Sequence, residues 1–146
     1  MKYITEKKAN LIIKKFLKEN KFYFNVIKRN YGFIVKENWL SMLIAIRCTI
    51  DEDIMVINYN IVLNNNVKEI NLILKKLNDF GYNSLIKNVK ICEVKKDVLM
   101  IKHIIGSIEK VEENDIKKSV KSFFSDEIKQ ILIRLDDESI SSEYNL

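Results

Sequence analysis

Residues 42–63 read MLIAIRCTIDEDIMVINYNIVL, and this stretch decides the fold class. Apolar side chains alternate with other residues on both sides of the acidic triplet at 51–53, which is the pattern of two half-buried strands. The triplet supplies the turn between them. Both strands also carry apolar residues on their second face, such as Leu43 and Val56. We therefore predict an antiparallel hairpin at the centre of a sheet.

Two further strand pairs flank this hairpin along the chain. Before it, aromatic and β-branched residues at 22–27 and 33–35 are separated by a segment with Asn and Gly, which tolerate positive φ. After it, strand patterns at 86–94 and 98–105 are joined by a charged triplet. The three hairpins predict an antiparallel sheet of about four to six strands.

Three amphipathic segments predict helices that pack against this sheet. Apolar residues recur at helical spacing in 5–19, in 67–80 and in 116–135. Thr5 caps the first segment, and Gly81 follows the second at a position where a left-handed residue ends a helix. The order of elements is helix, strands, helix, hairpin, helix, so the predicted fold class is α+β.

The length of 146 residues suits a single domain, which we expect to span residues 1–135. The last eleven residues, 136–146, have no periodicity and carry four acidic side chains without Lys or Arg. They are predicted to form a flexible tail that is dispensable for folding. The expected core draws on every part of the domain: Phe16, Ile44, Ile46, Ile57, Leu74, Leu77, Ile101, Phe124 and Ile131.

The positive charge behind the net value of +5 comes from lysine far more than from arginine. The chain holds 22 Lys, 3 Arg, 24 Ile and 16 Asn, a bias expected of an AT-rich coding sequence. Because the tail is acidic, residues 1–135 carry a net charge of +9. Arginine is the residue that grips phosphates and bases with two parallel hydrogen bonds, so its scarcity favours solvated helix faces over a nucleic-acid surface. The alternative is a functional basic surface, for which the candidate residues are Lys14, Lys15, Lys18, Lys28 and Arg29.

No group of residues in the sequence indicates a chemical reaction. The single histidine, His103, lies in a strand pattern and is interpreted as a structural or surface strand residue. Cys48 and Cys92 each lie in an apolar run, which is typical of buried thiols. Three glycines cannot build a phosphate-binding loop. We expect no catalytic residue, no metal and no cofactor.

The apolar run at 39–46 is far shorter than the ~20 residues of a membrane helix. The N-terminal residues lack the continuous apolar region of a signal peptide. We expect a cytoplasmic protein that does not bind membranes.

The order of elements resembles the YbjN and type III secretion chaperone-like families. These have an N-terminal helix, a three-stranded meander, a middle helix, two more strands and a C-terminal helix, so the residue pattern predicts one strand more. The resemblance covers residues 4–135 and is closest in the middle helix, which ends LNDFG at 77–81, and in the strand pair up to Ile105. It implies a small non-catalytic adaptor, often a homodimer, that binds a segment of another protein along its sheet or helix surface. The alternative function is a basic nucleic-acid-binding domain.

Overall fold

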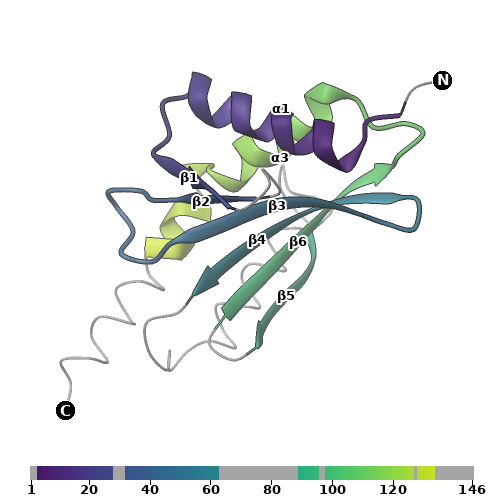
Figure 1. Ribbon diagram of the computed structural model, residues 1–146. Coiled ribbons are helices and arrows are strands. Elements are labelled where there is room, and N and C mark those ends of the chain that lie inside the picture. The colour runs from purple at the N-terminus through teal and green to yellow at the C-terminus, as the bar shows by residue number, and fades with distance from the viewer. Residues whose placement is uncertain (1–2, 28–31, 63–88, 96–97, 127, 134–146) are drawn as a thin grey trace, which may run out of the picture.

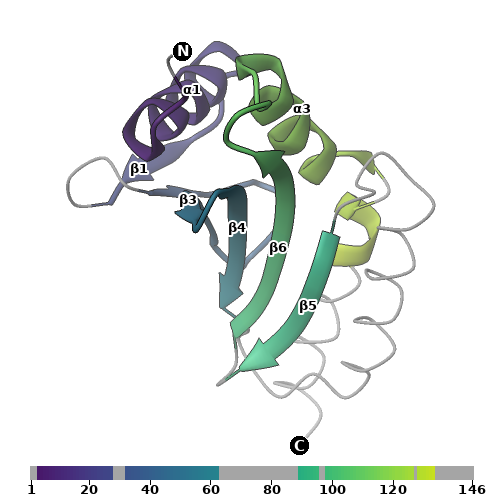
Figure 2. The same ribbon diagram turned by 90° about the vertical axis from the view of Figure 1, so that its right-hand side faces the viewer.

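The computed structural model describes residues 3–27, 32–62, 89–95, 98–126 and 128–133. Within those ranges the chain forms α1 (Glu6–Glu19), β1 (Phe24–Val26), β2 (Phe33–Val35), β3 (Ile44–Asp51), β4 (Ile54–Val62), β5 (Val89–Lys95), β6 (Val98–Ser107) and α3 (Glu113–Phe123). Figures 1 and 2 show α1 and α3 side by side against the sheet. The predicted α+β class is confirmed. The predicted middle helix at 67–80 and the tail at 136–146 lie outside the described residues.

The strands form one antiparallel sheet in the order β1-β2-β3-β4-β6-β5. The central hairpin predicted from residues 42–63 is confirmed, because β3 and β4 pair along the whole of β3 and turn between Asp51 and Ile54. The hairpin of β5 and β6 joins the sheet through its second strand, so β6 pairs with β4 and β5 lies at the edge. The six described strands agree with the residue pattern.

One face of the sheet forms the core with α1 and α3. A row such as Ile46, Tyr59 and Ile101, paired across β3, β4 and β6, is buried. Four residues of the predicted core lie fully within it: Ile44, Ile46, Ile57 and Ile101. Three others are half-buried and pack against it: Phe16, Phe124 and Ile131. Leu74 and Leu77 lie outside the described residues.

Both ends of α1 follow from local sequence. Thr5 caps the first turn through its side chain, as predicted. At the other end Lys21 adopts a positive φ of 59°. Its N–H donates to the carbonyl of Lys18, and the N–H of Phe22 donates to the carbonyl of Leu17. This is the Schellman pattern, in which a left-handed residue satisfies the last carbonyls of a helix.

The predicted continuous helix at 116–135 is wrong in one respect, because the helix is interrupted. α3 ends at Phe123, and the chain turns before helical structure resumes at Asp126. Phe123 stacks on a ring of β4, and Phe124 contacts the ring of Phe22 with centroids 4.6 Å apart. Successive helical positions point roughly 100° apart, and the turn allows both rings to reach the core. None of the described helices is long and apolar enough to span a membrane.

Where β2 ends, side chains of α1 form hydrogen bonds with the edge of β3 in its place. The pairing of β2 with β3 stops at Ile46. Beyond it, the N–H of Ile50 donates to the Glu6 carboxylate at 3.0 Å, and the backbone of Cys48 pairs with the amide of Asn10. An unpaired strand edge is a liability that folds must cover. The sequence pattern places Asn10 in the helix but does not indicate this role.

Candidate functional site

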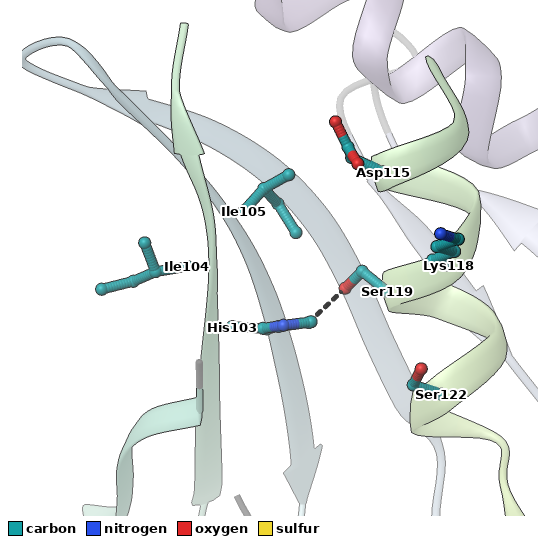
Figure 3. A pocket seen from close by; sticks show the side chains of 7 residues that line it. All are labelled: His103, Ile104, Ile105, Asp115, Lys118, Ser119 and Ser122. Carbon is teal, nitrogen blue, oxygen red and sulfur yellow. Dashed lines mark hydrogen bonds between the residues drawn. The ribbon is translucent and has the colours of Figure 1, made fainter. Parts of the chain in front are cut away.

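A buried polar network joins α3 to the sheet. The Ser119 hydroxyl on α3 lies 2.9 Å from the hydroxyl of Tyr59 on β4 and hydrogen-bonds to Nδ1 of His103 on β6. All three side chains are buried, and the Tyr59 ring stacks on Phe123 with centroids 4.0 Å apart. Figure 3 shows His103 and Ser119 pointing toward each other. The sequence pattern places His103 in this strand but gives no sign of its partners.

A small pocket lies beside this network, between β6 and α3 (Figure 3). Its volume is about 130 Å³, whereas pockets for drug-sized ligands and cofactors occupy roughly 300–1,000 Å³. It is lined by His103, Ile104, Ile105, Asp115, Lys118, Ser119 and Ser122. The pocket is therefore too small to enclose a nucleotide or a comparable cofactor.

Burial sets the protonation of the titratable groups nearby. It lowers the pKa of His103 to about 4 and raises the pKa of Tyr59. At neutral pH both rings are therefore uncharged. Burial and, secondarily, the carboxylate of Glu6 raise the pKa of the Cys48 thiol to about 12. Cys48 is a buried, protonated thiol as predicted, while the side chain of Cys92 lies outside the described part of the chain.

The Ser119–His103 pair has the residue types of an activated nucleophile and its base. The Ser119 side chain is buried, however, and its oxygen is engaged by His103 on one side and Tyr59 on the other. Within the described ranges, no three or more His, Cys, Asp or Glu side chains gather as a metal site would require. The arrangement is suited to holding α3 on the sheet, because its neutral groups satisfy one another's hydrogen bonds.

The structure brings together only part of the predicted basic surface. Lys14, Lys15 and Lys18 lie on α1, where Lys14 is half-buried and the other two are exposed. Lys15 forms an exposed ion pair with Glu19 at 3.9 Å, and such pairs contribute little to stability. Lys28 and Arg29 lie outside the described residues.

A second surface is formed by the face of the sheet opposite α1 and α3, which we call the outer face. Strand alternation and register assign its residues, and Figure 3 shows Ile104 on the other side of β6 from His103. The rows that cross the sheet on this face pair Ile34 with Ala45, Arg47 with Asn58, Asn58 with Lys102, and Val56 with Ile104.

The outer face exposes both apolar and cationic side chains. Its exposed apolar members are Tyr23, Ile27, Leu43 and Ile54. Its exposed cations are Lys36, Arg47 and Lys102. The sequence pattern correctly places apolar residues on two faces of the central hairpin. It does not indicate that Leu43 and Ile54 on the second face are exposed, because an apolar side chain that a helix buries and one that is exposed look the same in a sequence.

No family model matches the sequence, and no curated protein matches it. Among solved structures, the chain is similar to the crystal structure of YbjN from E. coli, described as a candidate transcription regulator. The two share 10% sequence identity over 84% of this chain and 87% of that chain, with a TM-score of 0.50. The comparison shows a YbjN-like fold, in agreement with the resemblance inferred from the order of elements.

Proposed function

We propose that the protein is a non-catalytic adaptor that binds another protein through the outer face. One observation carries this proposal. Seven large hydrophobic side chains are exposed among the described residues, and four of them lie on this single face. Leu43 and Ile54 lie at opposite ends of the hairpin of β3 and β4, so the apolar side chains are spread along one face. Apolar side chains that share one surface in this way mark an interaction site, whereas single scattered ones need no explanation.

The residues around these apolar side chains also fit a protein interface. Half-buried Ile34, Val56 and Ile104 continue the apolar surface between strands. Arg47 and Lys102 supply exposed polar groups beside them. Protein interfaces combine an apolar centre with polar groups in this way, and arginine is enriched in them.

A nucleic-acid-binding domain is the second candidate, and one row of the outer face favours it. Arg47, Asn58 and Lys102 lie side by side across β3, β4 and β6. Sheet surfaces that bind single strands add aromatic rings on which bases stack. On the outer face the described exposed aromatic is Tyr23, which lies next to the edge strand β1 rather than beside this row. The adaptor is therefore the better supported function.

The experiment compares two leucines of nearly equal exposure on different surfaces. Leu43 on the outer face is 44% exposed, and Leu11 on α1 is 45% exposed. The wild-type protein, the Leu43→Asp variant and the Leu11→Asp variant are used to capture partners from the source cell. We expect the Leu43→Asp variant to lose protein partners that the other two retain. Equal capture by all three proteins would refute the proposed use of the outer face.

The two candidate functions differ in their dependence on salt. The logarithm of the affinity for nucleic acid falls linearly with the logarithm of the salt concentration. The slope is proportional to the number of phosphates that the protein contacts. Micromolar binding of DNA or RNA that persists at ~150 mM salt would favour the second candidate, because non-specific binding is weaker under those conditions.

A further inference from the structure

The described charged residues at the centre of the outer face are cations. Arg47 and Lys102 flank Asn58 in the middle row and are exposed. With strands about 4.8 Å apart, two strand spacings separate the backbones of these two cations by roughly 10 Å. The two side chains start from backbones at this spacing, and the Arg47 guanidinium extends past the edge of β3 to within 3.9 Å of Glu6 on α1.

The described part of this face has its acidic residue at one end. Among the described side chains, the carboxylate of this face is that of Asp51, at the turn between β3 and β4. Among the described side chains of this face, none beside Arg47 or Lys102 is acidic.

The ion pair that Arg47 makes is weak. Its guanidinium lies 3.9 Å from a Glu6 oxygen, and the Arg47 side chain remains 55% exposed. Exposed pairs at this distance are screened by water and salt. Arg47 is therefore available to a carboxylate of a partner, to which it can donate two parallel hydrogen bonds.

The same features argue against two other occupants. A second copy docked through the same face would bring a second Arg47 and a second Lys102 into the interface, and like charges that meet there are costly. Nucleic acid would satisfy the cations but leave the half-buried apolar residues Ile34, Val56 and Ile104 against a phosphate backbone. The amide nitrogen of Asn58 already donates to Thr49 Oγ1 at 3.0 Å, which reduces its capacity to read a base.

We propose that the outer face selects an acidic, partly apolar segment of another protein, whose carboxylates contact Arg47 and Lys102 while its apolar side chains cover the flanking rows. This inference rests on the proposed adaptor function and defines the chemistry of the partner. Complementary charge increases the association rate and excludes partners of the wrong sign.

Two synthetic peptides with the same apolar residues test this proposal, one with glutamate and one with lysine at the intervening positions. Each is titrated into isotope-labelled protein at low salt, and the amide signals of Arg47, Asn58 and Lys102 are followed by NMR. We expect the glutamate peptide to shift these signals, with an affinity that falls as salt is added. Equal shifts with the lysine peptide, or none with either peptide, would overturn the proposal.

Charge reversal provides the matched variants. The Arg47→Glu/Lys102→Glu double variant should bind the glutamate peptide about tenfold or more weakly than the wild type. The Lys7→Glu/Lys8→Glu double variant changes the net charge equally on exposed positions of α1 and should change the affinity less than about twofold. Since Arg47→Glu also places a carboxylate near Glu6, Lys102→Glu alone is the variant to use if the double variant does not fold.

The outcomes separate this inference from the proposed function. If both peptides bind equally and Leu43→Asp abolishes binding, the outer face is a docking surface but does not select acidic partners. If DNA or RNA shifts the three amide signals at lower concentration than the glutamate peptide does, the acidic partner is a nucleic acid and the proposal is wrong. If Leu43→Asp has no effect on any partner, the adaptor function itself fails.

Discussion

The side-chain amide of Asn10 pairs with both backbone groups of Cys48, as a neighbouring strand would. The N–H of Cys48 donates to Asn10 Oδ1 at 2.9 Å, and Asn10 Nδ2 donates to the Cys48 carbonyl at 3.0 Å. Asn10 is fully buried, and both bonds are shielded from water. This residue couples α1 to the sheet where β2 no longer pairs with β3.

Replacing Asn10 with Ala should destabilise the protein by about 2–4 kcal/mol, because it leaves the buried N–H and C=O of Cys48 without partners. The free energy of unfolding, measured by urea titration, checks this. Asn20 serves as a control, since its side chain also donates to a carbonyl, that of Phe16, but is exposed. Asn20→Ala should cost less than about 1 kcal/mol, and equal losses at both sites would contradict the role of Asn10.

The free energy of unfolding should fall between pH 6.5 and pH 4 because of His103. Burial lowers the pKa of its imidazole from 6.5 to about 4. Between these values the unfolded chain binds a proton that the native protein does not, so stability is complete above pH 6.5 and declines as the pH falls. The contribution lost by pH 4 is about 3 kcal/mol.

Carboxylates also titrate in this range, so the test is a comparison with the His103→Gln variant. The difference in unfolding free energy between pH 7 and pH 4.5 should be smaller in the variant than in the wild type. Identical pH dependence in the two proteins would mean that His103 takes up its proton as readily in the native state as in the unfolded chain.

Replacing Lys21 with Gly should raise the free energy of unfolding by about 0.5–1 kcal/mol. Lys21 adopts a positive φ of 59° at the end of α1, a conformation that glycine reaches without a Cβ penalty. The gain is reduced by the greater freedom of glycine in the unfolded chain. A loss of stability in thermal melting would show that the Lys21 side chain stabilises the native state by more than the backbone strain costs.

The two faces of the central hairpin should respond differently to truncation. Ile57 is fully buried, and Ile57→Ala should cost about 2–5 kcal/mol through lost burial and a cavity. Leu43 is exposed, and Leu43→Ala should change stability by less than about 0.5 kcal/mol. A large loss at Leu43 would mean that the outer face is part of the core.

The central hairpin and α1 could be predicted because their signals are local. Alternation over residues 42–63 defines two strands, and a cap with helical spacing defines the helix. The interruption after Phe123 could not be predicted, since it depends on rings contributed by Tyr59 and Phe22, far away in the chain.

The candidate site could not be predicted as well as the hairpin, because a site on a sheet surface depends on which elements cover each face of the sheet. Leu43 and Ile44 are adjacent and both apolar, yet one is exposed and the other is buried. Arg47 and Lys102 are 55 positions apart in the chain, and only the register of β3, β4 and β6 places them on either side of Asn58. For the same reason, the predicted cluster of lysines on α1 does not identify the surface where charge and apolar groups meet.

Site-specific photocrosslinking in the source cell tests the adaptor function most directly. A photoreactive amino acid is introduced at position 43 on the outer face or at position 11 on α1, two sites of matched exposure. The adaptor function predicts a discrete adduct with another protein from position 43 and no such adduct from position 11. The same adducts from both positions, or crosslinks from position 43 only to nucleic acid or to a second copy of the chain, would contradict it.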